Sequence, residues 1–365
     1  MKENKKYDKV WKRVKSMKKN NPFSLSFGKE PKSLINSSSQ YNEIKNNFTE
    51  DNPVSSTYLI TGVRGSGKTV LLTRLSKYFA NNDDWIVVEL NPEIEMFEYL
   101  ASSIYEQINS KFKLIKKDFS FSFSGLTFSI SGENPVSNVI TLLEKMFEII
   151  NKKNKRVLIC IDDVSNNANI RAFIQQFQIF IRKDYPIFLL MTGLFENVRN
   201  IQNEKTLTFL YRALQVNIGP LSLIDIADSF SEILNVEKEE AVKMAKLTNG
   251  YAFAYQVLGY ILFENDSKIL NKKIIAEFDK YLREYVYEKI YYDLPETEKQ
   301  FVIALASTTG EISKVMEELN MNKQNISQYR DKLLKKGIIV KNGWGKIAFA
   351  LPRIKEYLLI QKDFY

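Results

Sequence analysis

The 365-residue sequence contains no histidine and a single cysteine, Cys160. The absence of histidine excludes serine–histidine and cysteine–histidine catalytic pairs, histidine general bases and histidine metal ligands. One cysteine allows neither an intrachain disulfide nor a zinc cluster, which is typical of a reducing compartment and predicts a cytoplasmic protein. No apolar run reaches the roughly 18 residues that a membrane helix needs, and the N-terminus has no apolar signal core, so we expect no membrane partner.

Positive charge is concentrated at the two ends of the chain. The net charge of the whole sequence is +9. Residues 1–20 carry nine Lys or Arg and two acids, and residues 295–365 carry twelve Lys or Arg and eight acids. The residues between these ends therefore have a net charge of −2. Basic ends on a nearly neutral body predict a polyanionic partner that binds the ends.

Residues 1–20 are predicted to form a basic amphipathic helix. Apolar residues recur among its lysines at spacings of three and four, at Tyr7, Val10, Trp11, Val14 and Met17. Three roles are open for this helix: it packs on the body of the protein or frays, it contacts nucleic acid, or it lies on a membrane surface. The Ser-, Asn- and Pro-rich residues 22–56 are expected to form an extended lead-in to the next domain.

Apolar, β-branched segments alternate with amphipathic segments between residues 57 and 218. The predicted strands are 57–61, 85–90, 157–162, 187–192 and 214–218, and the predicted helices are 68–79, 95–111, 136–150 and 170–181. Apolar strands that alternate with helices are typical of an α/β fold, in which helices cover both faces of a parallel sheet.

One segment interrupts this alternation. Between residues 119 and 131, aromatic or aliphatic residues alternate with serine or threonine, and Gly125 lies at the centre. This pattern predicts a two-stranded hairpin inserted at about 118–132. Two interpretations are open. In one, Phe119, Phe121 and Phe123 pack on a neighbouring helix, and in the other, the hairpin protrudes and contacts a protein partner or DNA.

The predicted strands of the sheet stop before Pro220, and the rest of the chain divides into two parts. Residues 222–292 are helical segments, which predicts an all-α lid. In the last part, helices at 294–308, 312–319 and 323–336 precede strands at 337–341 and 346–350, a winged helix-turn-helix pattern. The predicted division is an N-terminal segment 1–21, a parallel-sheet domain 22–219, a helical lid 220–293 and a winged-helix domain 294–365.

A phosphate-binding motif lies between the first predicted strand and the first helix of the sheet domain. Gly62-Val-Arg-Gly-Ser-Gly-Lys68-Thr69 matches G-x-x-x-x-G-K-[ST] without deviation. Its glycines let backbone amides curl around phosphates, and the positive end of the next helix attracts the anion. We expect Lys68 to reach the β- and γ-phosphates and the Thr69 hydroxyl to bind Mg²⁺. The predicted residues of this ATP and Mg²⁺ site are Gly62, Arg64, Gly65, Ser66, Gly67, Lys68, Thr69 and Val70.

Polar residues end two later strands of the predicted sheet. Asp162 and Asp163 end one of them, and a carboxylate there is costly unless it serves a cation. We expect Asp162 to hold Mg²⁺ through water and Asp163 to polarise the attacking water. Thr192 ends the strand 187–192 and would face the γ-phosphate if this strand lay between the other two. Structural interpretations are open as well, namely acids that cap a helix and a threonine that begins a turn.

Together these residues resemble AAA+ and STAND P-loop ATPases, and more narrowly the prokaryotic relatives of origin-recognition initiators that carry a C-terminal winged helix. The resemblance extends over residues 22–360. It implies the strand order 5-1-4-3-2 and an N-terminal segment that folds over adenine, here Asn21-Pro22-Phe23 and Phe27-Gly28-Lys29-Glu30-Pro31. It also implies an arginine finger at Arg212 that acts in trans in a homo-oligomer. A simple surface arginine is the alternative.

The chain departs from this family at three places. Ile35-Asn36-Ser37 stands where a Gly-Arg pair is usual in the adenine-covering segment. Asp163 stands where AAA+ ATPases usually have glutamate, which implies slow hydrolysis. Phe253 stands where initiators have an arginine, so the lid would supply no cation to the γ-phosphate. The lid would then close weakly on ATP, or through other contacts.

The third helix of the winged helix carries side chains suited to DNA. Residues 323–346 contain seven Lys or Arg and one acid, Asp331. Glutamine and asparagine pair with adenine edges, and lysine and arginine with guanine or phosphate. The candidate DNA-binding residues are Lys323, Gln324, Asn325, Ser327, Gln328 and Arg330, with Lys341 and Lys346 on the wing beside Asn342 and Trp344. A winged helix that makes only protein contacts is the alternative.

The leading hypothesis is an ATP-dependent switch that engages DNA in replication, transposition or mobile-element maintenance. Hydrolysis, assisted by Lys68, Asp163, Thr192 and Arg212, would change the lid angle and so the placement of the winged helix. The alternative is a STAND-type signalling or defence ATPase whose winged helix makes protein contacts and keeps a nucleotide-bound state inhibited. A third hypothesis is a structural subunit that binds nucleotide without turnover.

Overall fold

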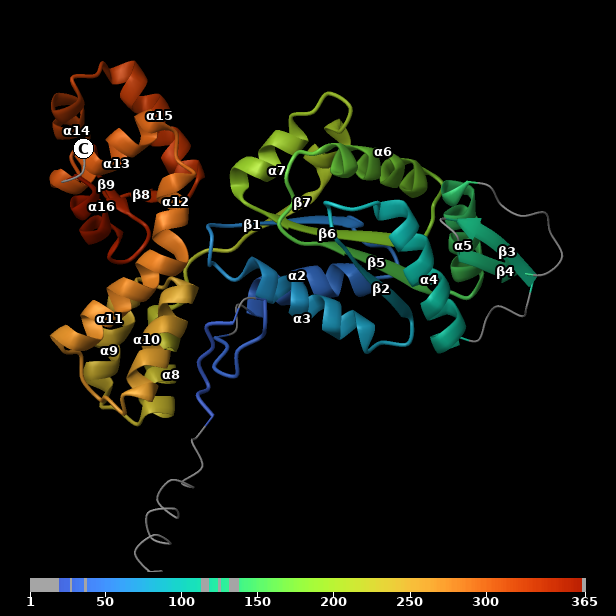
Figure 1. Ribbon diagram of the computed structural model, residues 1–365, viewed down its shortest axis with the longest axis horizontal. Coiled ribbons are helices and arrows are strands. Elements are labelled where there is room, and N and C mark those ends of the chain that lie inside the picture. Colours follow the sequence, from blue (N-terminus) through green and yellow to red (C-terminus); the bar gives the residue numbers. More distant parts are fainter. Residues whose placement is uncertain are drawn as a thin grey trace, which may run out of the picture.

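A computed structural model describes residues 20–26, 28–35, 38–112, 118–123, 126–130 and 138–362. Figure 1 shows a sheet domain with flanking helices beside a second body of helices that includes a small hairpin. The basic helix predicted for residues 1–20 lies outside the described residues, apart from Asn20. Among the described helices, none has both the length and the apolar character needed to cross a membrane.

Five parallel strands form the central sheet. They are β1 (Thr57–Thr61), β2 (Trp85–Leu90), β5 (Arg156–Ile161), β6 (Ile187–Gly193) and β7 (Leu214–Asn217). Their order is β2-β5-β6-β1-β7, and each neighbouring pair runs parallel. This order confirms the predicted α/β class and the arrangement 5-1-4-3-2. Because β6 lies between β1 and β5, Thr192 lies between the P-loop strand and the strand that precedes the two acids.

Helices cover both faces of the sheet and enclose two apolar cores. On one face, α2 (Ser38–Thr49) and α3 (Lys68–Ala80) bury a core that includes Leu75 and Phe79. The second core is covered by α4 (Met96–Phe112), α5 (Val139–Lys152), α6 (Ala168–Arg182) and α7 (Phe195–Gln202). Side chains alternate along each strand, so Leu59 enters the second core and Ile60 the first. A 3-10 turn, η1 (Thr208–Arg212), leads into β7.

Helix α2 contradicts the extended lead-in that the sequence predicts for residues 22–56. Ile44 and Phe48 lie one turn apart on its buried face. The centroid of the Phe48 ring lies 5.4 Å from that of Tyr58 and 5.0 Å from that of Phe188. Two apolar residues among asparagines and serines are a weak periodic signal, so packing on the sheet rather than local sequence determines this helix.

The predicted hairpin is present between α4 and α5. β3 (Asp118–Phe123) and β4 (Leu126–Ile130) pair antiparallel, with Ser120 opposite Ser129 and Phe121 opposite Phe128. Figure 1 shows the hairpin at the end of the sheet domain that is farthest from the helical body. The two interpretations of its phenylalanine face concern side chains outside the described part of the structure.

The C-terminal part is helical apart from one small hairpin. The lid consists of α8 (Leu223–Leu234), α9 (Lys238–Thr248), α10 (Ala252–Glu264) and α11 (Lys272–Leu282), which continues through the π-helical turn η2 (Arg283–Tyr287) into α12 (Glu288–Tyr292). The winged helix consists of α13 (Glu296–Ser307), α14 (Ile312–Leu319), α15 (Lys323–Lys335), β8 (Ile339–Lys341) and β9 (Ile347–Phe349). A last helix, α16 (Ile354–Lys362), follows and was missed from the sequence, although its buried Ile354, Tyr357 and Leu358 have helical spacing.

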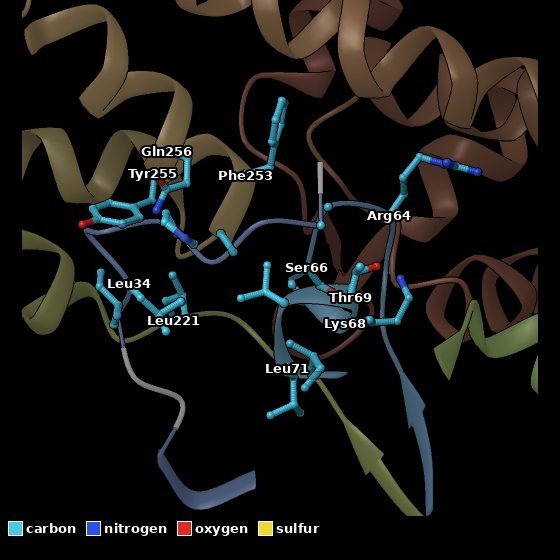
Figure 2. A pocket seen from close by; sticks show the side chains of 18 of the residues that line it. Leu34, Arg64, Ser66, Lys68, Thr69, Leu71, Leu221, Phe253, Tyr255 and Gln256 are labelled. Carbon is cyan, nitrogen blue, oxygen red and sulfur yellow. The ribbon is translucent and has the colours of Figure 1, made fainter. Parts of the chain in front are cut away.

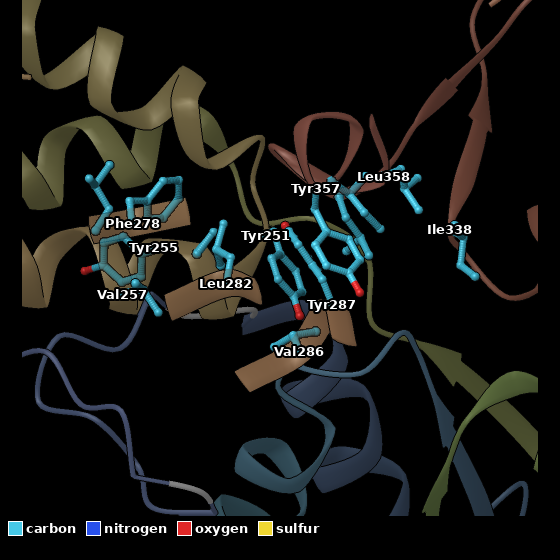
Figure 3. Packing of buried hydrophobic residues seen from close by; sticks show 14 of the residues in the cluster. Tyr251, Tyr255, Val257, Phe278, Leu282, Val286, Tyr287, Ile338, Tyr357 and Leu358 are labelled. Carbon is cyan, nitrogen blue, oxygen red and sulfur yellow. The ribbon is translucent and has the colours of Figure 1, made fainter. Parts of the chain in front are cut away.

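The lid and the winged helix share one continuous apolar core. Figure 3 shows Leu282 of the lid, Tyr287 and Tyr357 along the seam between the two. Arg353 reinforces the seam with two hydrogen bonds to the Asp279 carboxylate, at 2.8 and 2.6 Å. The predicted boundary at 293/294 therefore falls within a packed unit, and we expect the lid and the winged helix to move together.

Candidate nucleotide-binding site

A cavity of about 490 Å³ lies where the sheet domain meets the lid. Its floor is formed by the P-loop and by residues just after β5 and at the end of β6, and its far wall by the N-terminal segment and α10. The carboxyl ends of parallel strands next to a crossover are the usual ligand site of such sheets. Figure 2 shows Lys68 and Thr69 at one end of this cavity and Leu34, Leu221 and Tyr255 at the other.

Backbone carbonyls of the P-loop hold the Lys68 side chain in place. Gly67 precedes α3 in a left-handed conformation, with φ of 101°, so α3 begins at Lys68. The Lys68 ammonium donates hydrogen bonds to the carbonyls of Gly62 at 3.1 Å and Val63 at 2.9 Å. Burial lowers the pKa of Lys68 to about 8, against the opposing effect of the Asp163 and Asp162 carboxylates. A phosphate at this site would restore the full charge of the amine.

Three predicted residues meet at the ends of neighbouring strands. The Thr69 hydroxyl donates to the Asp162 carboxylate, with oxygen distances of 3.1 and 2.9 Å. The Thr192 hydroxyl, which is fully buried, donates to the same carboxylate and accepts a 3.0 Å hydrogen bond from the backbone amide of Asp163. Thr192 thus contacts the Asp162 side chain and the Asp163 backbone, and it also lines the cavity, so its contact with the γ-phosphate stays a prediction.

The donor set fits a phosphate and a hard divalent cation. The Ser66 hydroxyl is buried in the P-loop without a hydrogen-bond partner among the described residues, which suits a phosphate oxygen as acceptor. Within the described part of the chain, no three His, Cys, Asp or Glu side chains gather as a metal site. Asp162 and Thr69 offer two oxygen ligands, which matches Mg²⁺ because this ion keeps waters and takes further ligands from phosphates.

Asp163 lies at the edge of the cavity in an unusual backbone conformation. Its φ is +51°, and its side chain is exposed where it lines the cavity. Asparagine and aspartate tolerate this left-handed region better than other side chains do. The exposed side chain therefore lies at the cavity, on the side of the P-loop where phosphates would bind.

The other end of the cavity is apolar and is closed by the N-terminal segment. Leu25, Leu34 and Ile35 line it together with the ring of Tyr255 from α10. The Tyr255 hydroxyl donates to the carbonyl of Ser33 at 2.9 Å, and the amide of Ser24 donates to the Gln256 side chain at 2.9 Å. These bonds attach the segment to the lid, so a planar base would lie between apolar side chains of the two.

The lid contacts the P-loop through backbone acceptors. The Tyr251 hydroxyl donates to the carbonyl of Arg64 at 2.6 Å, and the amide of Phe253 donates to the carbonyl of Gly65 at 3.2 Å. The side chain of Phe253 lines the cavity where the resembling initiators have an arginine. The sequence did not reveal Tyr251, Tyr255 or Gln256 as site residues, because only the fold brings them to the P-loop.

The two arginines predicted for the nucleotide site, Arg64 and Arg212, lie in different places. Arg64 lines the cavity, with one guanidinium nitrogen 4.0 Å from the Asp293 carboxylate. Arg212 ends η1 on the surface and does not line the cavity. The structure therefore does not bring Arg212 to the residues of its own site.

The candidate DNA-binding residues lie on α15 and on the wing. Those with exposed side chains are Lys323, Gln324, Asn325, Gln328, Lys341 and Lys346, whereas Ser327 and Arg330 are half-buried. Arg330 binds the Asp331 carboxylate at 2.8 Å, and Lys346 lies 3.4 Å from that of Glu311. The charge of Arg330 is thus partly neutralised within the same helix.

Lys336, at the end of α15, ties the winged helix to the sheet domain. Its ammonium lies 2.8 Å from the buried Glu298 carboxylate and 3.1 Å from that of Glu196 in the first turn of α7. The next residue, Gly337, approaches the P-loop so closely that a β-carbon there would meet the Val63 side chain at 2.4 Å. We call these contacts of Lys336 and Gly337 with Glu196 and Val63 the latch. Lys336 is one of the seven basic residues between 323 and 346, and its charge is used within the protein.

Comparisons with known proteins match the C-terminal region in sequence and most of the chain in fold. Residues 284–358 match a domain of unknown function (DUF8462). No curated protein matches the sequence. Among solved structures, the Aeropyrum pernix ORC2 protein in ADPNP–ADP complexes has a TM-score of 0.50 at 12% identity, covering 85% of this chain and 89% of that chain. This likeness shows the fold, that of an AAA+ P-loop ATPase with a C-terminal winged helix.

Two further solved structures have lower scores. Cdc6p from Pyrobaculum aerophilum has a TM-score of 0.46 at 17% identity, covering 93% of this chain and 97% of that chain. A STAND ATPase with a tetratricopeptide repeat sensor from Pyrococcus horikoshii has a TM-score of 0.40 at 18% identity, covering 92% of this chain and 44% of that chain.

Proposed function

We propose that this chain is an ATP-hydrolysing switch that places a C-terminal winged helix on DNA. The observation that carries the proposal is the joint use of the lid. α10 forms one wall of the P-loop cavity, and the lid shares a continuous core with the winged helix. A change at the nucleotide therefore has a direct mechanical route to the winged helix.

Each site residue has a role in this proposal. Lys68 and the P-loop amides bind the β- and γ-phosphates, and Asp162 and Thr69 hold Mg²⁺, which neutralises phosphate charge when bound. Asp163 orients the attacking water from the edge of the cavity. Thr192 positions Asp162 and the backbone of Asp163 through its two hydrogen bonds. Leu25, Leu34 and Ile35 enclose the base and exclude water from it.

The latch supports a coupling between ATP and the winged helix. Lys68 binds the carbonyl of Val63, and Val63 is the residue that Gly337 contacts. A γ-phosphate that captures the Lys68 ammonium removes this hydrogen bond and changes the surface on which Gly337 rests. Thr192 also lies four residues before Glu196, the other partner of the latch. ATP should therefore weaken the latch and release the winged helix toward DNA.

Binding of a labelled mixed-sequence DNA duplex at low salt tests this function. We expect an affinity about 5- to 150-fold higher with a non-hydrolysable ATP analogue than with ADP, the range of typical allosteric couplings. Raising the salt concentration should weaken binding in both states, because phosphate contacts release counterions. No binding in either state at low salt would reject the DNA half of the proposal.

The latch also favours a second candidate function. A winged helix that packs on the P-loop is what a STAND-type ATPase would need to hold a nucleotide-bound inhibited monomer. Under this candidate, ADP remains bound through purification and no nucleotide state shifts DNA. The nucleotide content of the purified protein, read together with the DNA experiment, separates the two candidates.

Arg212 is proposed to act between subunits. Its guanidinium is on the surface and away from its own cavity, which suits a site on a neighbouring copy in a homo-oligomer.

The hairpin β3–β4 is proposed as a contact for a protein partner, since it lies at the free end of the sheet domain (Figure 1).

A further inference from the structure

The tip of the wing carries a tryptophan whose side chain is fully exposed to solvent. Trp344 is 100% exposed, whereas Trp85 in the sheet is 2% exposed. A fully exposed indole leaves a large apolar surface in water, and tryptophan is enriched at interfaces. Nothing in the nucleotide site or the latch uses this side chain.

The wing presents Trp344 on a firm base with open space around it. Asn342 donates its backbone amide to the carbonyl of Lys346 at 3.0 Å, which closes the turn between β8 and β9. The base is anchored to the start of α14, where the Ile312 amide donates to the carbonyl of Gly345 at 3.0 Å. Gly343 and Gly345 both have positive φ, and a β-carbon on either would meet nothing within 4 Å. Together with the full exposure of Trp344, this leaves the indole open to a flat ligand.

The charge around the tip indicates the chemistry of the ligand. Residues 338–347, which form the wing, contain two lysines and no acid. Lys341 and Lys346 flank Trp344 in sequence and are exposed, and Glu311 forms an ion pair with Lys346. The partner must therefore combine anionic groups with a flat apolar face. A nucleobase attached to its phosphates has both.

We propose that Trp344 stacks on an unpaired nucleobase, so that the wing recognises single-stranded or locally opened DNA. The faces of bases inside an intact duplex are covered by their neighbours, and uncovering one costs a few kcal/mol per step. An unpaired base has an exposed face and pays no such cost. This inference rests on the proposed DNA function and adds the form of DNA that the wing prefers.

The other class of partner for a Trp–Lys tip is a membrane surface. One indole buries little apolar area, and a single weak anchor gives only marginal, reversible membrane binding. Stacking on a base needs only one aromatic side chain with uncovered faces, and Trp344 is such a side chain. Nucleic acid is therefore the partner that the observations favour.

The test compares Trp344→Ala with wild type on a labelled single strand and on a blunt duplex of the same sequence. We expect Trp344→Ala to weaken single-strand binding about 5- to 100-fold, the usual loss for one stacked base, and to change duplex binding by less than about twofold. Trp344→Phe should retain part of the single-strand affinity. Tyr292→Ala removes another exposed aromatic ring, 78% exposed in α12, and should change neither affinity.

Fluorescence gives a second measurement on the same proteins. The emission that Trp344→Phe removes belongs to Trp344, and we expect the single strand to quench it while the duplex does not. Equal losses on both substrates, or no loss on the single strand, would overturn the stacking proposal. Trp344-dependent binding to anionic vesicles without quenching by DNA would also overturn it. Wild type that binds neither DNA would instead reject the proposed function itself.

Discussion

Replacing Asp163 with asparagine should lower the rate of ATP hydrolysis by about 10²- to 10⁴-fold, the usual contribution of a group that activates the nucleophile. Asp163 faces the cavity from an exposed position, so its carboxylate is free to orient water. Asparagine has nearly the same shape and tolerates the left-handed backbone at φ of +51°. The substitution therefore removes the charge without straining the loop, and nucleotide affinity should change little.

Steady-state phosphate release and equilibrium binding of a fluorescent ATP analogue measure these two effects. Asp184→Asn is a matched control, because Asp184 is also exposed and left-handed, with φ of +55°, but does not line the cavity. Hydrolysis by Asp163→Asn at the wild-type rate would contradict the role of Asp163. A wild type without any turnover would favour the structural subunit that only binds nucleotide.

Replacing Lys68 with alanine should weaken ATP binding by about 10- to 100-fold, because hydrogen bonds to charged groups contribute about 1.5–3 kcal/mol. The ammonium lies at the phosphate end of the cavity, and burial lowers its pKa despite the Asp163 and Asp162 carboxylates, so a phosphate would stabilise its charged form. ADP binding should fall less than ATP binding, since the γ-phosphate contact is absent. The loss should extend to hydrolysis, which needs the same contact.

Isothermal titration with ATP and ADP measures both affinities. Lys77→Ala is the control, because Lys77 lies in the last turn of the same helix and is exposed. Equal losses for ATP and ADP would place the ammonium on the β-phosphate alone. An unchanged ATP affinity in Lys68→Ala would contradict the assignment of this cavity to nucleotide.

Local sequence signals predict the features that lie within one segment of chain. The P-loop motif determines where β1 ends and α3 begins, and the apolar strands predict the parallel sheet. The order of α13, α14 and α15 with the following hairpin predicts the winged helix. Each of these depends on residues close in sequence, which periodicity and turn chemistry detect.

Contacts between distant segments could not be predicted in the same way. The bond from Tyr251 to Arg64 joins residues 187 positions apart, and nothing in either segment signals the other. The latch is a similar case, because Lys336 is an ordinary basic residue in sequence and an interdomain contact in the structure. The seven basic residues counted between 323 and 346 therefore overstate the charge available for DNA.

The structure shows which contacts hold the lid on the P-loop although Phe253 supplies no cation. The sequence predicts a lid that closes weakly or through other contacts, because Phe253 replaces the expected cation. The hydroxyl of Tyr251 and the amide of Phe253 bond to P-loop carbonyls instead. Lid closure thus depends on hydrogen bonds to the P-loop backbone, and the P-loop is also the segment that would bind a phosphate.

The central claim is that the nucleotide controls the docking of the winged helix on the sheet domain. Cysteines introduced as Lys205→Cys and Ser313→Cys, both at exposed positions, accept spin labels, while the native Cys160 is buried. Electron–electron resonance then measures the distance between the two domains in solution. With ADP we predict one short distance, and with ATP trapped by Asp163→Asn we predict a longer one. The same distance in both nucleotide states would contradict the account.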